Sequence, residues 1–455
     1  MLIALSCLLI ASVSANVQLS FQKVTSLLET VYEDTYTISG YNGNDFNIKK
    51  LQFRVNPELV DSLKIMKVYE GNTLLSTNST FTQNSFTIYF QKPKRSEENF
   101  NLKISLFFFK PYKFVPYKIT VKEDQMIEYS DNVLNLEFDD DVELVSLKGK
   151  YIIPSQLHNY SRDIIEKEEG IRNDQKALVI KQMTGPVISQ RFTAYYTANM
   201  PFEVFRVAKK RIDVSMWGNL ALNYYFDITN DAAEVDGEVS NIDFGIQSQT
   251  GGKNAMRYNQ MMLSRDISML SIRDEVGNMT RCFAGKGNPS ELEIIVVPRF
   301  ALFGQWNSTY MIDYNQKSLK HLFVNSRDSS VFKLEYQFEH PLSHILSKEF
   351  YLTFCLPEFS ELISTNLPES LYPVVQSKEY GFFEYFGKNC YIHRYDNVLK
   401  ATHEQGVSIL FRYNTVYLWW KLGYIVTVVT VFFAIVFALA RVDMSFDKAQ
   451  KVKTA

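Results

Sequence analysis

One stretch near the carboxyl end restricts the fold of this chain more than any other. The run LGYIVTVVTVFFAIVFALA, from Leu422 to Ala440, has no charged side chain and is bracketed by Lys421 and Arg441. An α-helix rises about 1.5 Å per residue, so the run spans about 28 Å, close to the thickness of the hydrocarbon layer of a bilayer. The sequence therefore predicts a single transmembrane helix, within a segment 416–441 that includes its interfacial flanks.

The amino-terminal residues predict the orientation of that helix. Residues 1–15, MLIALSCLLIASVSA, are apolar, too short to span comfortably, and end in small residues, as a cleaved signal peptide does. Trp419 and Trp420 precede the apolar run, where amphipathic rings favour the headgroup level, and basic residues follow it. We therefore expect a type I protein with roughly 400 residues in the lumen and a cytosolic tail, 442–455.

The tail and the sugar acceptors indicate a compartment. The chain ends in KVKTA, with lysines at Lys451 and Lys453. This spacing is similar to the dilysine signal that returns resident membrane proteins to the endoplasmic reticulum; the alternative is ordinary positive charge on the cytosolic side. The N-x-S/T acceptor pattern occurs at Asn78, Asn159, Asn278 and Asn307. Both features favour an endoplasmic reticulum membrane protein.

The segment between the two apolar runs has the composition and patterning of β domains. The chain is 46% hydrophobic and 22% charged, and its formal charge of -2 excludes the positive field that nucleic acid requires. Stretches such as SFTIYFQKPK and ELEIIVVPRFALF alternate or cluster β-branched and aromatic residues between Pro, Gly and Asn breaks. We predict a mainly β luminal part built from two tandem β-sandwich-like domains, 16–203 and 204–415, with a possible surface helix beginning at Ser161 and ending near Gly170.

Cysteine usage is sparse. Three cysteines remain after the signal segment, and in an oxidising compartment they allow one bridge. We predict a disulfide between Cys355 and Cys390, with buried free thiols as the alternative. The absence of a Cys-x-x-Cys pattern argues against thiol redox chemistry.

The sequence contains none of the common catalytic motifs considered below. The chain has no G-x-S-x-G elbow, no P-loop and no H-E-x-x-H pattern. His340 and His344 form a poor metal cage, and the acidic run 139–141 is better interpreted as a polar loop than as a calcium site. The basic cluster 209–211 is interpreted as a solvated strand edge in preference to a docking patch. We expect no catalytic residue, cofactor or metal, and only Trp217 and Trp306 stand out as rings with a possible binding role.

The apolar run itself carries a packing pattern. Thr430, Ala434 and Ala438 recur at intervals of four residues, and Gly423 and Thr427 form a neighbouring stripe. Small residues in such rows allow close approach of a second helix in lipid, although ordinary membrane composition is the alternative. The pattern favours a subunit of a membrane complex.

Two motifs in the second half resemble a known family. The stretch IDVSMWGNLALNYYFDITNDAAEV contains Ser215, Trp217, Gly218 and Asn219, and the stretch PRFALFGQWNSTYMIDYN contains Pro298, Arg299, Phe300, Phe303, Gly304 and Trp306. Together with IRDEVGNMTR and the exit RVDMSF after the helix, they are similar to the ribophorin I family, whose members are subunits of the oligosaccharyltransferase complex. The usual doubled glycine before the tryptophan is replaced here by a glycine followed by Gln305.

The resemblance implies a noncatalytic subunit that supports transfer of a preassembled oligosaccharide from a dolichol lipid to Asn in N-x-S/T. Its expected partners are the catalytic and small membrane subunits of that complex, and nascent glycoproteins are possible substrates. The alternatives are an independent resident cargo receptor or chaperone of the same topology, and a luminal sugar-processing hydrolase.

Overall fold

The computed structural model describes residues 17–28, 30–43, 47–75, 77–80, 85–138, 142–154, 156–172, 175–184, 190–239, 254–285, 290–338, 340–342, 345–381, 384, 386–399 and 406–442. The signal segment 1–15, the acidic run 139–141, and most of the tail, with Lys451 and Lys453, lie outside the described residues. Predictions made for those segments therefore stay predictions.

The described residues of the first half form strands and one short helix. Its elements are β1 (Val17–Ser26), β2 (Val31–Asn42), β3 (Ile48–Val55), α1 (Pro57–Val60), β4 (Leu63–Glu70), β5 (Thr73–Leu74), β6 (Thr77–Thr80), β7 (Ser85–Lys94), β8 (Asn99–Phe109), β9 (Tyr112–Phe114), β10 (Lys118–Ile119), β11 (Met126–Asn132), β12 (Leu136–Phe138), β13 (Val142–Pro154), β14 (Leu157–Tyr160), β15 (Ile165–Arg172), β16 (Gln175–Met183) and β17 (Arg191–Thr197). The large sheet has the order β15-β16-β13-β1-β2-β8-β4-β5.

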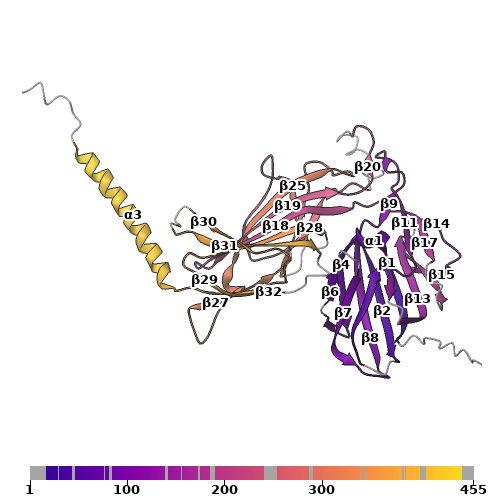
Figure 1. The fold of residues 1–455 in the computed structure, drawn as a ribbon. Helices are drawn as coiled ribbons and strands as arrows, with labels where there is room; N and C mark the ends of the chain where they lie inside the picture. Colours follow the sequence, from indigo (N-terminus) through magenta and orange to yellow (C-terminus); the bar gives the residue numbers. More distant parts are fainter. Residues whose placement is uncertain are drawn as a thin grey trace, which may run out of the picture.

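The second half is again built from strands, and a long helix follows it (Figure 1). Its elements are β18 (Glu203–Ser215), β19 (Asn219–Asn230), β20 (Glu234–Val235), β21 (Asn259–Ser264), β22 (Ile267–Asp274), β23 (Cys282–Ala284), β24 (Glu291–Val296), β25 (Asn307–Lys317), η2 (Ser318–Lys320), β26 (Leu322–Val324), β27 (Val331–Gln337), β28 (Leu346–Leu356), β29 (Glu361–Asn366), β30 (Val375–Glu379), β31 (Lys388–Val398), β32 (Gly406–Arg412) and α3 (Val416–Arg441). The large sheet has the order β22-β25-β19-β18-β28-β31-β30.

The two large sheets share a strand order. In the first, β1 pairs antiparallel with β2 and parallel with β13. In the second, β18 pairs antiparallel with β19 and parallel with β28. Reading outward from these strands, β8 corresponds to β25, β16 to β31 and β15 to β30. The repeated order is what two tandem domains of similar fold would show, although the boundary at 203 and 204 stays a prediction.

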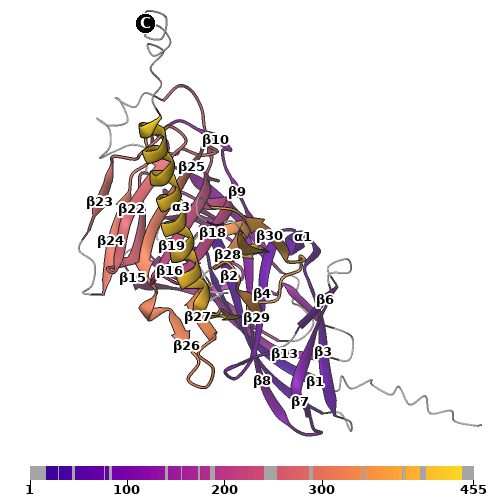
Figure 2. The same ribbon diagram turned by 90° about the vertical axis from the view of Figure 1, so that its left-hand side faces the viewer.

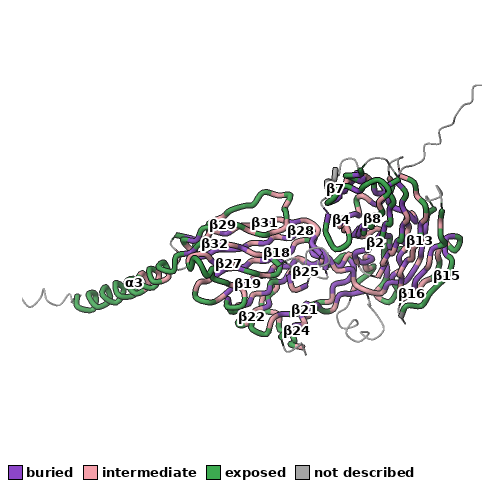
Figure 3. The backbone as a smooth tube through the Cα atoms, turned by 90° about the horizontal axis from the view of Figure 1, so that it is seen from below, coloured by how far each residue is buried: buried purple, intermediate pink, exposed green. Residues whose placement is uncertain are grey.

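Each large sheet shares an apolar core with smaller sheets. In β19 every second residue is buried, as a strand packed on one face requires. One core draws on residues from Val17 to Phe202 and also takes in Ala232 and Ala233 of the second half, and a second core draws on residues from Phe205 to Tyr413. The predicted β-rich fold is therefore confirmed, and burial follows the period-two pattern along the strands (Figure 3).

A buried lysine occupies the same place in both large sheets. Lys23 lies opposite Tyr36 in β2, and Lys210 lies opposite Tyr224 in β19. The Lys23 ammonium is 3.1 Å from a carboxylate oxygen of Asp131, as a buried charge requires. The Lys210 ammonium donates to the carbonyl oxygen of Gln337 at 2.6 Å.

The helix α3 projects from the second half, on the side opposite the first half (Figures 1 and 2). It is 26 residues long, it is apolar enough to span a membrane, and no residue in it is buried against the β body. Among the described residues it is the one helix with this property. The predicted single C-terminal apolar helix is confirmed.

Two smaller predictions were wrong. The segment expected to be helical, from Ser161 to near Gly170, contributes most of the edge strand β15, because it pairs with β16 and places Ile164 and Ile165 in the first core. The charged side chains of β15 from Glu166 to Glu169 are exposed, and such charges protect a sheet edge from pairing with other chains. The basic cluster 209–211 is on β18 in the middle of a sheet, where Lys210 is fully buried, so it is no solvated edge.

Candidate functional site

The two family motifs lie at opposite ends of one hairpin. β18 and β19 pair along their whole length, and a strand of this length spans about 40 Å. The motif at 215–219 forms the turn between the two strands, near the first residues of α3. The motif at 298–306 lies beside Asn230, where β19 ends and the chain crosses to the first half. We call these two regions the helix junction and the inter-half junction.

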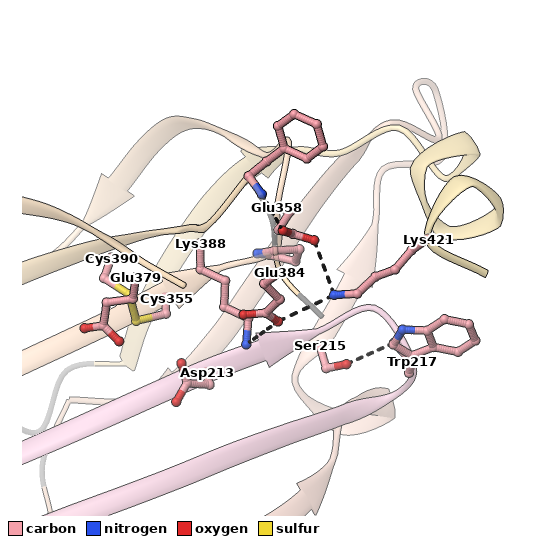
Figure 4. A network of polar contacts seen from close by, with 12 residues as sticks. Asp213, Ser215, Trp217, Cys355, Glu358, Glu379, Glu384, Lys388, Cys390 and Lys421 are labelled. Carbon is pink, nitrogen blue, oxygen red and sulfur yellow. Dashed lines mark hydrogen bonds and ion pairs between the residues drawn. A yellow bond between two sulfur atoms is a disulfide. The ribbon is translucent and has the colours of Figure 1, made fainter. Parts of the chain in front are cut away.

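Ion pairs connect α3 to the β body at the helix junction (Figure 4). The Lys421 ammonium lies 3.3 Å from a carboxylate oxygen of Glu358 and 3.5 Å from one of Glu384. Glu384 also pairs with Lys388 at 2.9 Å. These side chains are largely shielded from solvent, with 9% exposure for that of Glu358, so their attraction is screened less than that of a surface pair. The network fixes the beginning of α3 against two loops of the second half.

Aromatic stacking reinforces the same contact. The ring of Tyr417 stacks on Phe359 with centroids 4.4 Å apart, and Phe359 contacts Phe386 at 4.8 Å. The Asn414 side chain, which precedes the N-cap residue Thr415, accepts a hydrogen bond from the Val416 N–H, the first N–H of α3. A cavity of about 110 Å³ between these rings and the hairpin turn is bordered by Trp217.

The motif residues at the hairpin turn have structural roles. Gly218 has φ +89°, a conformation that glycine adopts without strain. The Ser215 hydroxyl accepts a hydrogen bond from the Trp217 N–H at 3.3 Å, and Asn219 pairs with Lys317 of β25. Trp217 itself contributes no core packing, because 57% of it is exposed.

Asn230 organises the inter-half junction. It is fully buried, and its side-chain oxygen accepts from the Phe202 N–H at 2.9 Å. Its amide nitrogen donates to the carbonyl oxygens of Asn254 and Leu302 at 2.8 and 2.9 Å. One side chain therefore joins the residue before β18, the end of β19 and the second motif, so that Asn230 acts as a positioning residue that sequence inspection alone did not find.

The second motif fits closely around this crossing. A Cβ added to Gly304 would lie 1.7 Å from the carbonyl oxygen of Ala233, so only glycine is accommodated without movement. Gln305 has φ 68°, in the left-handed region that favours glycine, and its side chain donates to the Ala232 carbonyl oxygen at 2.8 Å. Phe303 is buried, and its ring contacts that of Trp306.

The other motif residues complete the same surface. The ring of Phe300 contacts that of Trp306 edge to face. Arg299, which follows Pro298, hydrogen-bonds Asp274 and lowers the pKa of that carboxyl. These contacts support the fold of the motif, and none of them assembles a nucleophile with a base.

Direct contacts cross from the second half to the first. Lys110 pairs with Asp231 at 2.8 Å, and the Ala233 N–H donates to the Gln125 side-chain oxygen at 3.0 Å. Strands β10 and β20 pair in parallel, and β20 lies beside the first half in Figure 1. An apolar cluster adds three residues from each half: Val31, Phe107, Phe109, Val204, Leu346 and Leu399.

The structure also locates the remaining predicted residues. Asn159, Asn278 and Asn307 are exposed, as acceptors of sugar must be, and Asn78 is on β6, where side chains lie outside the described residues. Cys355 and Cys390 face each other on β28 and β31, and their sulfur atoms are joined in a disulfide. The sulfurs lie near the Glu379 carboxylate, but bonded sulfurs are not available as thiolate ligands for a metal.

The histidines considered as metal ligands and a larger cavity lie in the second half. His340 is buried against Phe205 and Phe226 and shares a hydrogen bond with Ser347, while His344 lies outside the described residues. A cavity of about 530 Å³ opens beside Lys210. In its lining the Tyr336 hydroxyl donates to the Gln316 side-chain oxygen at 2.9 Å, and His321 shares a hydrogen bond with the Glu335 carbonyl oxygen at 3.1 Å.

The architecture defines a class: a two-part β protein that ends in one helix able to span a membrane, with its distinctive motifs placed at junctions. The ribophorin I family model matches residues 17–440, so the chain belongs to the ribophorin I family. The match includes the first half, where the sequence resemblance was weak.

Curated relatives show the same similarity. The chain is 24% identical to dolichyl-diphosphooligosaccharide–protein glycosyltransferase subunit 1 of Caenorhabditis elegans. The similarity extends over 223 residues, which are 49% of this chain and 37% of the relative. It is 25% identical over 273 residues to subunit 1A of Arabidopsis thaliana, covering 58% and 43%, and 27% identical over 225 residues to subunit 1B of the same plant, covering 49% and 47%. The matched region thus spans less than half the length of these relatives.

Proposed function

We propose that this chain is a noncatalytic subunit of an oligosaccharyltransferase complex in the endoplasmic reticulum membrane. The observation that carries the proposal is the family match over residues 17–440, together with relatives named as subunit 1 of that glycosyltransferase. In this role the β body lies in the lumen, and the transfer of oligosaccharide to Asn of N-x-S/T takes place on another subunit.

The arrangement of the two family motifs supports an assembly role. Gly304 and Gly218 have glycine-specific environments at the two junctions, and Lys421 is engaged by carboxylates of the body. Their shared effect is to hold two β halves and one helix in a fixed relation. A protein that positions other proteins requires such rigidity, and we infer that the chain works by complex assembly and presentation of nascent glycoproteins.

The face of α3 supports association with another membrane helix. The Thr427 hydroxyl donates to the Gly423 carbonyl oxygen at 2.8 Å, and the Thr430 hydroxyl donates to the Val426 carbonyl oxygen at 2.8 Å. These hydroxyls are therefore satisfied within the helix and present only small surfaces outward. We propose that Thr430, Ala434 and Ala438 face a partner subunit, which cross-linking from Ala434 would identify.

Co-purification and depletion test the proposal. A mild-detergent extract should yield the tagged chain together with the catalytic subunit, and depletion of the chain should cause broad underglycosylation. Recovery of the chain alone under conditions that keep the complex intact would contradict it. Misrouting of selected cargo with full glycosylation would instead support the cargo-receptor alternative.

Localisation has its own test. Replacing Lys451 and Lys453 with alanine should allow a fraction of the chain to leave the endoplasmic reticulum, read as maturation of its glycans. In sealed microsomes the tail should be accessible to protease while the body is protected. A protected tail would contradict the proposed orientation.

A further inference from the structure

Aromatic side chains that contribute little to the cores gather around the first turns of α3. Trp217 is 57% exposed, Phe386 55% and Phe359 37%, and they belong to three different loops of the second half. Phe386 contacts Phe359, which stacks on Tyr417 of the helix. We call Trp217, Phe359 and Phe386 the aromatic rim.

The rim lies at a defined level along α3. Trp217 and Phe359 line the same small cavity as Tyr417, Leu418 and Lys421. Lys421 directly precedes the uncharged run of the helix, and Trp419 and Trp420, both highly exposed, are its immediate neighbours. If α3 spans a bilayer, this level is that of the headgroups and the glycerol backbone, where Trp and other amphipathic rings are favoured.

The charges beside the rim fit the same surroundings. Glu358 and Glu384 both pair with Lys421, and Glu384 pairs also with Lys388. Carboxylates paired in this way can approach lipid at lower cost than isolated ones. The stacking of Phe359 on Tyr417 keeps the body close to the helix at this point, so the rim cannot move far from the level of Lys421 without breaking these contacts.

We propose that the aromatic rim enters the headgroup layer of the leaflet on the β-body side, so that the second half lies against the membrane. The proposal rests on the membrane-spanning role of α3, which is part of the proposed function. The partner of the rim in this proposal is lipid. Lipid is preferred to a protein partner because the rim is continuous with the exposed surface of α3, which is apolar enough to span a membrane.

The four tryptophans of the chain provide the test. The full chain is reconstituted in phosphatidylcholine nanodiscs as three variants: one retaining Trp217 alone (W306F, W419F, W420F), one retaining Trp306 alone (W217F, W419F, W420F) and one retaining Trp419 and Trp420 (W217F, W306F). Trp306 is a matched control, because it is partly exposed but lies at the far end of the β18–β19 hairpin. Emission is compared in ordinary lipid, in lipid brominated near the headgroup end of the acyl chain, and with aqueous acrylamide.

The proposal expects brominated lipid to reduce the emission of Trp217 and of the Trp419–Trp420 pair, and to leave Trp306 unchanged. Quenching of Trp217 by acrylamide to the same extent as Trp306, with none by brominated lipid, would overturn it. Protection of Trp217 from both quenchers would also overturn it, because protein would then cover the rim.

The helix variant separates two kinds of failure. Lipid quenching of Trp419 and Trp420 without quenching of Trp217 rejects the rim proposal and leaves the membrane span intact. Absence of quenching in both variants rejects the span itself. If a triple substitution does not fold, the difference between the wild-type chain and the single variant Trp217→Phe gives the same readout.

Discussion

The two ends of the β18–β19 hairpin make different contacts. At the inter-half junction the second half contacts the first through buried side chains and backbone hydrogen bonds. At the helix junction it contacts α3 through ion pairs and half-exposed rings. Asn230 at the inter-half junction is fully buried, while the Lys421 side chain at the helix junction is 27% exposed. Close packing and buried hydrogen bonds thus dominate the first junction, to which the Lys110–Asp231 ion pair adds, whereas charge and stacking dominate the second. The difference predicts that α3 is held to the β body less strongly than the two halves are held to each other.

Substitution of Gly304 should break the inter-half junction most severely. In Gly304→Ala the new Cβ meets the backbone of Ala233, which cannot rotate away, so we expect a loss of about 3 kcal/mol in the free energy of unfolding. Urea unfolding of the purified chain in detergent measures the loss. Gly406→Ala is the matched control, because no atom lies within 4 Å of its added Cβ. Equal stability of the two variants would show that the junction tolerates movement.

Removal of the Asn230 side chain should cost somewhat less. Asn230→Ala leaves the Phe202 N–H and the Leu302 carbonyl oxygen without this partner in a buried place, and we expect a loss of about 2 kcal/mol. Asn223→Ala, which removes one half-buried hydrogen bond to Asp313, should lose less than half as much. If both changes had the same effect, Asn230 would have no special role.

A change at Glu203 should strengthen the inter-half junction in a pH-dependent way. Burial raises the pKa of Glu203, which pairs with Asn230 across the hairpin, to about 7. At pH values between the pKa of Glu203 in the unfolded chain and 7, the Glu203 carboxyl keeps its proton in the folded state and loses it in the unfolded state. The free energy of unfolding therefore falls as the pH rises through this range, and it is constant at higher pH. Glu203→Gln should therefore gain about 1 kcal/mol at pH 8 and nothing near pH 4. A gain of the same size at both pH values would exclude ionisation as the cause, and the exposed Glu361→Gln is the control.

Substitution at the helix junction should change the free energy of unfolding least and the position of α3 relative to the β body most. Lys421→Met removes the ion pairs with Glu358 and Glu384, at a cost of about 1 kcal/mol. The measurement is the distance distribution between spin labels placed by Leu371→Cys and Val442→Cys in a Cys282→Ser background, and we expect it to broaden. Arg441→Met, at the opposite end of α3, should leave the distribution unchanged. An unaltered distribution for Lys421→Met would show that stacking alone fixes the helix.

Local patterns predicted most of the fold but little of the two junctions. The period-two alternation of β19 and the uncharged run of α3 are properties of neighbouring residues, so both elements were predicted. The segment after Ser161 was assigned wrongly because its charges fit an exposed helix as well as an edge strand. Glu358 and Glu384 carry no sequence signal for α3, since they are far from Lys421 in the chain and only the fold brings them together.

The sequence by itself determined the β-rich body, the one apolar helix and the family, because alternation, hydrophobic length and motif spacing act over a few residues at a time. Only the tertiary structure decided that the two motifs are junctions, that Lys210 is buried in a central strand, and that Trp217 lies level with the start of α3. Those facts depend on contacts between residues distant in the chain, whose pairing is set by the packing of whole sheets.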